Sequence, residues 1–313
     1  MKNQTTVVEF IILGLSNSLH IDIFLFVILL LVFLSTVMGN LIIITLSLVD
    51  HRLHSPMYFF LRSFAVVEIC FTSVITPRLL YSLLTGRKSV SLPGCFLQLC
   101  FVCFLGACMF CHGSVMSFDR YMAICHPLRY GPIMNGRLCF QLVLGCWLVS
   151  FSTMFPHVFM TMLVPFCGSN IINHFYCDTA ALLHLSCTDT GHVELIVFVS
   201  ATVILLGTLT VNTTSYVFII SSVMRIPSST GRRKAFSTCS AHFLVVVILY
   251  ASSITRYVQP SQRGVQDLDK VMSLLYCVVT PLFNPYIYAL RNEQLKASFK
   301  DAWGRAFSQW LRL

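Results

Sequence analysis

The 313-residue chain is 56% hydrophobic and only 11% charged, and its mean hydropathy is +0.79. Soluble domains carry about 25% charged residues, so this composition excludes an ordinary soluble protein and indicates a membrane protein. The formal net charge is +9. In a membrane protein such an excess of basic residues reports topology rather than a nucleic-acid interface.

A helix that crosses a bilayer needs roughly 20 mostly apolar residues. Seven stretches meet this requirement: residues 23–49, 56–80, 96–125, 139–164, 193–224, 236–258 and 268–290. The first stretch lacks a small-residue cleavage site, so we expect no cleavable signal peptide. The sequence predicts an all-α membrane protein with one domain, residues 1–313. Its parts would be an N-terminal tail (1–22), a seven-transmembrane helix bundle (23–290) and a C-terminal tail (291–313).

The basic residues predict the orientation of these helices. Seven spans place the termini on opposite sides, and a cytoplasmic C-terminus puts 14 of the 21 Lys and Arg residues on the inner face and 7 on the outer face. Basic residues gather on the cytoplasmic side of membrane proteins, so we expect an extracellular N-terminus and a plasma-membrane location. Asn3 begins an Asn-Gln-Thr acceptor for N-glycosylation, which agrees with that orientation.

The C-terminal tail has the pattern of a short amphipathic eighth helix. From Asn292 onward its apolar residues fall on one stripe, with basic residues beside it. The stripe consists of Leu295, Phe299, Ala302, Trp303, Ala306 and Phe307. We expect this helix to lie along the inner membrane surface. The alternative is a frayed polar tail.

The segment Met116-Ser-Phe-Asp-Arg-Tyr-Met-Ala-Ile-Cys-His-Pro127 sets an acid and a base, Asp119 and Arg120, side by side at the end of an apolar run. Charged side chains at membrane depth cost free energy, so such a pair is a functional candidate. The alternative is an interfacial charge pair that closes a transmembrane helix.

Three further strings accompany this segment. They are Leu53-His-Ser-Pro-Met-Tyr-Phe-Phe-Leu61, Lys234-Ala-Phe-Ser-Thr-Cys-Ser-Ala-His-Phe243 and Pro281-Leu-Phe-Asn-Pro-Tyr-Ile-Tyr-Ala-Leu-Arg-Asn292. Together the four strings resemble the vertebrate odorant receptors, a branch of the rhodopsin-like G-protein-coupled receptors. The resemblance implies a receptor and not an enzyme, with no cofactor. It would bind a small volatile odorant and activate a heterotrimeric stimulatory G protein of the olfactory type, which raises cyclic AMP.

Four of the 14 cysteines lie outside the apolar spans, on the predicted outer face: Cys95, Cys167, Cys177 and Cys187. An even number on an oxidising side predicts two disulfides, but four cysteines permit three pairings and the sequence does not choose among them. The resemblance implies the pairs Cys95–Cys177 and Cys167–Cys187.

The resemblance also implies an activation switch at the inner ends of the helices. Arg120 has five hydrogen-bond donors, so it could exchange a carboxylate partner, with Asp119 nearest, for other partners when the inner face opens. His242, near the inner end of span six, could neighbour Arg120; a packed helix histidine is the alternative. Tyr250 would lie deeper in span six and relay ligand contact to that helix.

Span seven contributes the remaining switch residues. Pro285 removes a backbone hydrogen bond and weakens the helix locally, while Asn284 can satisfy the polar groups that are freed. Tyr288 would then be a mobile aromatic side chain. A static kink is the alternative interpretation.

Glu68 is an ionisable residue in the middle of span two and is therefore a functional candidate. With Asn40 and Asn284 nearby it could hold a cation such as sodium, or it could stay protonated. Met109 stands in span three where odorant receptors often have a second acid, which argues against a sodium site shared by the two spans.

The ligand pocket is expected in the outer half of the bundle. Counted back from Arg120, the outer half of span three presents Val102, Cys103, Gly106 and Ala107. The resemblance implies that Ser253, Ile254 and Tyr257 of span six and Leu274 and Cys277 of span seven face the same cavity. This lining is mostly apolar and suits a small neutral ligand. Val102 stands where amine receptors have an Asp, which argues against an amine anchored there. His174, Cys177, His184 and Cys187 have the residue types of a metal site, but a disulfide-bonded cysteine is not a thiolate, so we predict no metal.

Three other functions were weighed. A receptor of the same fold for a non-volatile ligand outside the nose remains open. A transporter predicts repeated halves and paired midplane charges, and the sequence has one midplane acid, Glu68, and no repeat. An enzyme would need an acid, base or metal cluster within the spans, and the sequence has none there.

Overall fold

The structure, a computed structural model, describes residues 8–16, 18–167, 169–258 and 266–310. Within these ranges it describes only the backbone at 231, 233–239, 241, 254–258, 266–268, 289–291 and 305–310. The predicted glycosylation site, Asn3, lies outside the described residues.

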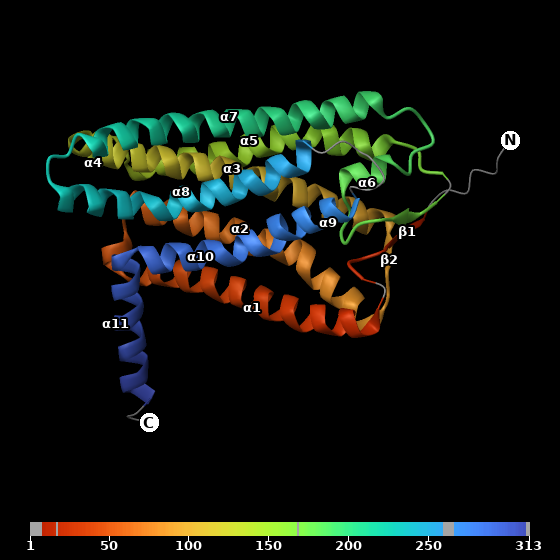
Figure 1. Ribbon diagram of the computed structural model, residues 1–313, viewed down its shortest axis with the longest axis horizontal. Coiled ribbons are helices and arrows are strands. Elements are labelled where there is room, and N and C mark those ends of the chain that lie inside the picture. The colour runs from red at the N-terminus through yellow and green to blue at the C-terminus, as the bar shows by residue number, and fades with distance from the viewer. Residues whose placement is uncertain (1–7, 17, 168, 259–265, 311–313) are drawn as a thin grey trace.

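Long helices packed side by side form the body of the molecule (Figure 1). Six are continuous: α1 (Leu19–Val49), α2 (Pro56–Thr85), α3 (Leu92–Cys125), α5 (Gly136–Leu163), α7 (Gly191–Met224) and α8 (Ser229–Val258). The seventh span consists of α9 (Gln266–Leu274), a π-helical turn (Leu275–Val279) and α10 (Thr280–Arg291). Each helix overlaps one of the seven predicted apolar stretches, so the seven-helix bundle is confirmed.

Among the described residues, six helices are long and apolar enough to cross a membrane. Five are α1, α2, α3, α5 and α7, and the sixth runs from Asp269 to Tyr288. In α8 the apolar segment among the described residues is His242–Ser253. The helices therefore provide the crossings that the composition predicted.

Local sequence explains where several helices begin and end. Pro56 opens α2, where a missing backbone N–H costs nothing. The side chains of Ser91 and Asn135 accept backbone N–H groups at the starts of α3 and α5. Gly86 ends α2 with a φ of 68°, a left-handed conformation that favours glycine.

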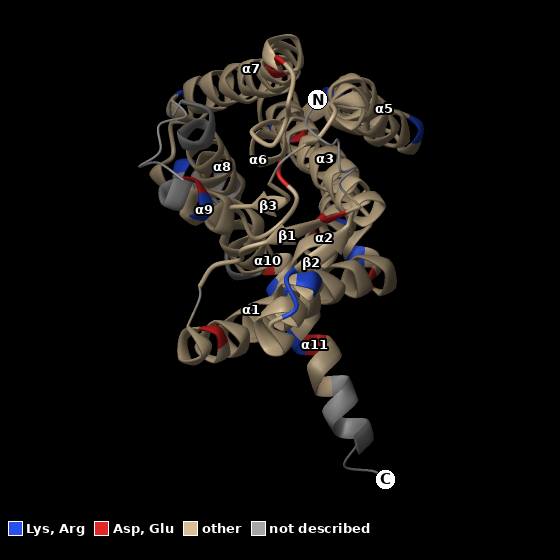
Figure 2. Cartoon of the chain, turned by 90° about the vertical axis from the view of Figure 1, so that its right-hand side faces the viewer, with Lys and Arg blue, Asp and Glu red and all other residues tan. Residues whose placement is uncertain are grey.

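One end of the bundle, here called the strand end, is covered by a small sheet and a short helix (Figure 2). Strand β1 (Glu9–Ile12) lies between β2 (Ser89–Ser91), to which it is antiparallel, and β3 (Ile171–Ile172), to which it is parallel. Phe10 pairs with Val90 and is fully buried. Helix α6 (Thr179–Leu183) lies beside the sheet in the loop between α5 and α7.

The opposite end, here called the tail end, carries α4 (Pro127–Ile133), the turn between α7 and α8, and α11 (Glu293–Trp310). Helix α11 runs across the axis of the bundle (Figure 1), and its Leu295 is buried while Phe299 and Trp303 are exposed and stacked on each other. The predicted amphipathic helix is therefore present. Its orientation suits a membrane surface parallel to α11.

Helix α3 is the centre of the bundle. It contacts α2, α5, α7 and α8, and its buried residues include polar groups as well as apolar ones. This position lets α3 contribute both to the strand-end cavity and to the charged groups at the tail end.

Candidate functional site

A cavity of about 420 Å³ lies in the strand-end half of the bundle, between α3, α5, α7, α8 and the seventh span. This volume is within the usual range for small-molecule sites, roughly 300–1,000 Å³. The predicted residues that line it are Val102, Cys103, Gly106 and Ala107 of α3 and Ser253 of α8.

The seventh span lines the cavity with a different residue from those expected. Neither Leu274 nor Cys277 is among the described lining residues, and Tyr276 takes their place. The π-helical turn Leu275–Val279 inserts an extra residue per turn, so it changes which side chains face the bundle centre. Ile254 and Tyr257 were also expected here, and their side chains lie outside the described residues.

Tyr276 approaches α3 closely because Gly106 has no side chain. A Cβ atom at Gly106 would lie 2.9 Å from the Tyr276 hydroxyl, which is shorter than an ordinary carbon–oxygen contact. Tyr276 also stacks on Phe110, with ring centroids 6.4 Å apart. Gly106 thus allows the tyrosine to form part of the cavity wall.

The loop between α5 and α7 supplies a polar roof that the pocket prediction did not include. Asp178 caps α6 by accepting the N–H groups of Ala180 and Ala181. His174 is buried, and its Nε2 lies 3.9 Å from Oδ2 of Asp269 on α9. His174, Asp178 and Asp269 all line the cavity. Asp before Thr-Ala-Ala is a helix-capping pattern and could have placed α6 from the sequence.

Two disulfides hold this roof. Cys95 at the start of α3 is bonded to Cys177, and Cys167 is bonded to Cys187 within the loop. These are the pairs that the resemblance implies. No group of three or more potential metal ligands occurs among the described residues.

A buried hydrogen-bond network lies next to the cavity, on its tail-end side. Phe110 of the cavity wall packs edge-on against Tyr250 of α8, with ring centroids 5.2 Å apart. The Tyr250 hydroxyl donates to Thr208 Oγ1 at 2.5 Å and accepts from Asn212 Nδ2 at 3.2 Å. Asn212 also bonds to Ser114 and Ser117. The network joins α3, α7 and α8, and this polar role of Asn212 was not predicted.

The midplane acid Glu68 is fully enclosed. Asn284 Nδ2 donates to its Oε1, and the Asn40 amide lies within hydrogen-bond reach. Glu68 Oε2 and Asn284 Oδ1 have no hydrogen-bond partner among the described residues, and Met109 is completely buried. A proton or a cation would satisfy these two oxygens, so both alternatives stay open.

At the tail end, Arg120 is hydrogen-bonded to Asp119 through Nε and Nη2. The Tyr130 hydroxyl of α4 donates to the other Asp119 oxygen at 2.7 Å. Partial burial and the charge of Asp119 raise the pKa of Tyr130 well above its usual range, so the phenol keeps its proton and remains a donor. The acid and base of the motif therefore form an ion pair, and Tyr130 is hydrogen-bonded to its carboxylate.

The remaining predicted switch residues lie on α8 and α10. His242 is buried and its Nδ1 is 2.6 Å from the Tyr216 hydroxyl of α7, so its described hydrogen bond joins α8 to α7. Tyr288 of α10 is also buried. Pro285 lies inside α10, which continues as a helix through it.

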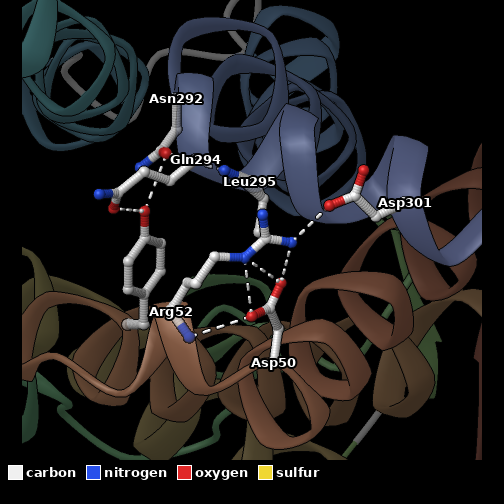
Figure 3. Close-up of polar contacts among 7 residues, drawn as sticks. Asp50, Arg52, Asn292, Gln294, Leu295 and Asp301 are labelled. Atoms are coloured by element: carbon white, nitrogen blue, oxygen red, sulfur yellow. Dashed lines mark hydrogen bonds and ion pairs between the residues drawn. The ribbon is translucent and has the colours of Figure 1, made fainter.

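A second charged group attaches α11 to the turn between α1 and α2 (Figure 3). Arg52 bonds to Asp50 at 2.8 Å and to Asp301 of α11 at 2.7 Å. The guanidinium holds the pKa of Asp50 well below its usual range. The Tyr58 hydroxyl bridges to Asn292 and Gln294 at the start of α11. These contacts, which the sequence analysis did not anticipate, fix the first turns of the helix.

Comparisons with known proteins agree with this architecture. The structure is similar to that of squid rhodopsin, with a TM-score of 0.75 and 15% identity over 91% of this chain and 81% of that one. The likeness shows a rhodopsin fold. Residues 26–305 match the family model described as "Olfactory receptor".

Curated relatives cover nearly the whole chain. "Olfactory receptor 6E1" of Mus musculus is 49% identical, with 96% of both chains covered. "Olfactory receptor 6C4" of Homo sapiens is 47% identical, with 96% of this chain and 98% of the relative covered. The chain therefore belongs to the olfactory receptor family, whose members are multi-pass membrane receptors and not enzymes.

Proposed function

We propose that this protein binds a small, mostly apolar volatile molecule in the strand-end cavity and activates a stimulatory G protein of the olfactory type, which raises cyclic AMP. The observation that carries the proposal is the pairing of a cavity of about 420 Å³ at one end with the Asp119–Arg120 ion pair at the other. A receptor needs both a ligand site and a site that can open toward a partner.

The strand end would face the outside of the cell. Two disulfides lie there, and disulfides persist in oxidising surroundings. The 14 to 7 division of basic residues supports the same orientation. The tail end, with Arg120, α4 and α11, would then face the G protein in the cytoplasm.

Ligand binding would act by shifting a pre-existing equilibrium. A ligand against Phe110 presses on Tyr250, whose hydrogen bonds reach α7 through Thr208 and Asn212. Movement of α8 would separate His242 from Tyr216 and release Arg120 from Asp119. Arg120 could then contact the G protein.

Cyclic AMP should be measured in cells that contain a stimulatory G protein and display the receptor, across a panel of volatile compounds. The Arg120→Ala variant at matched surface level is the comparison. We expect a ligand-dependent rise in the wild type that the variant lacks. A rise of equal size in both would contradict the role of Arg120, and silence toward volatile compounds would favour the non-volatile ligand alternative.

A further inference from the structure

One buried polar side chain in the cavity wall has a ring nitrogen without a protein partner. His157 of α5 is 5% exposed and lines the cavity. Its Nδ1 is buried and has no hydrogen-bond partner among the described residues. Its backbone carbonyl, within α5, accepts from Thr161 Oγ1 at 2.8 Å.

An unpaired buried polar group costs about 1–3 kcal/mol in proteins. Nδ1 is buried also from the cavity, so a ligand gains affinity when the imidazole ring turns to bring this nitrogen against the ligand's polar group. The α5 and α7 lining of the cavity is otherwise mostly apolar, with Ser200 as its other polar residue. Met154 is the other α5 residue in the lining, and Ile204 and Leu205 of α7 line the cavity as well. A ligand could therefore place its carbon skeleton on these residues and its polar group at the imidazole.

The geometry points to His157 as the residue that selects a neutral hydroxyl-bearing ligand, an alcohol or a phenol, within the receptor function proposed above. Neutral imidazole has one donor nitrogen and one acceptor nitrogen. A hydroxyl both donates and accepts, so it can bond to either nitrogen in either tautomer.

The charges of the cavity disfavour an anionic ligand. Asp178 and Asp269 line it, while no Lys or Arg does so in the part of the chain that the structure describes. A carboxylate ligand would be repelled. An ammonium group could be attracted to Asp178 or Asp269 in the roof, but beside His157 it would lose its hydration against the apolar walls, and α3 presents Val102 instead of an acid.

The test uses compounds that share one alkyl skeleton and carry a hydroxyl, methyl, ammonium or carboxylate group. The first readout is the ligand-induced rise in Tm of the purified receptor in detergent, which needs no G protein. The second is cyclic AMP in cells at matched surface level. Three variants accompany the wild type: His157→Leu, His157→Asn, and Met160→Leu as a control at an exposed position of the same helix outside the cavity lining.

We expect the hydroxyl compound to bind the wild type most tightly. His157→Leu should weaken its binding about tenfold, as expected for one lost hydrogen bond, without weakening the methyl compound. His157→Asn keeps a polar group near the Nδ1 position and should retain much of the preference. Met160→Leu should leave the preference unchanged.

Several results would overturn the inference: a hydroxyl preference that survives in His157→Leu, a preferred carboxylate or ammonium compound, or no Tm rise with any compound. If His157→Leu does not reach the surface, His157→Asn becomes the test. Loss of binding of both the hydroxyl compound and the methyl compound in His157→Asn would indicate a purely structural role for His157 and would overturn the inference. A His157-dependent Tm rise without cyclic AMP would support the inference and contradict the proposed coupling.

Discussion

The two ends of this molecule are held together by different chemistry. The strand end is closed by two disulfides and a three-stranded sheet. The tail end is held by side-chain contacts: the Asp119–Arg120 ion pair, the Tyr216–His242 hydrogen bond and the ion pair of Arg52 with Asp301 of α11. Covalent bonds and backbone ladders preserve shape, whereas side-chain pairs can exchange partners. The difference suits a bundle that keeps a cavity at one end and rearranges at the other.

The largest effect is expected from breaking the covalent end. The Cys95–Cys177 bond closes a loop with a sequence separation of 82, and loops of that size are worth about 4 kcal/mol on the chain-entropy estimate. Cys95→Ser should therefore abolish surface display and lower Tm strongly. Cys70→Ala, at a free and exposed cysteine, is the control, and normal display of Cys95→Ser would contradict the role assigned to the bond.

A narrower change tests the cavity itself. Gly106→Ala adds a methyl group 2.9 Å from the Tyr276 hydroxyl, so it should displace that side chain and raise the ligand concentration for half-maximal response at least tenfold. The double variant Gly106→Ala with Tyr276→Phe lacks the tyrosine hydroxyl that the new methyl group would meet, so it should recover most of the response. If the double variant is no better than the single one, the close approach does not shape the site.

At the tail end, Asp119→Asn removes the carboxylate that holds Arg120. The change removes more stabilising free energy from the resting state, in which Asp119 holds Arg120, than from the active state. The equilibrium therefore shifts toward the active state, and cyclic AMP in the absence of ligand should rise several-fold. Tyr130→Phe removes one hydrogen bond to the same carboxylate and should give a smaller rise. Unchanged basal signalling in Asp119→Asn would show that this pair does not hold the resting state.

The Tyr130 contact should be insensitive to pH. Its pKa is raised in the folded protein, so the protonated, donating form is the stabilised one and is lost only as pH rises through that higher value. Basal cyclic AMP signalling of wild type relative to Tyr130→Phe should therefore stay constant from about pH 6 to about pH 8. A ratio that changes within this range would assign the effect to another group.

The smallest effect is expected where α11 joins the bundle. Asp301 is largely exposed, and exposed ion pairs contribute little to stability. Asp301→Asn should leave Tm unchanged but speed amide hydrogen exchange in α11, whereas Lys300→Gln on the same helix should not. Equal exchange in both variants would mean that the Arg52 bridge does not hold α11.

The sequence was sufficient to predict the seven helices, because each needs a long apolar stretch, and α11, because its stripe is amphipathic. It could not predict the strands, which are four residues or fewer and depend on partners distant in sequence. The lining residues of α3 follow from helical spacing counted back from Arg120. Tyr276 was missed because a π-helical turn changes the spacing, and His157 because its unpaired Nδ1 is a property of packing.

The link between the two ends is the central claim, and Tyr250→Phe tests it most directly. This change removes the hydroxyl that bonds to Thr208 and Asn212 and keeps the ring against Phe110. Ligand-induced Tm rise and cyclic AMP should be measured together, with Tyr286→Phe at an exposed position of α10 as control. We predict that binding persists while signalling falls at least tenfold. Full signalling in Tyr250→Phe at matched surface level would contradict the account.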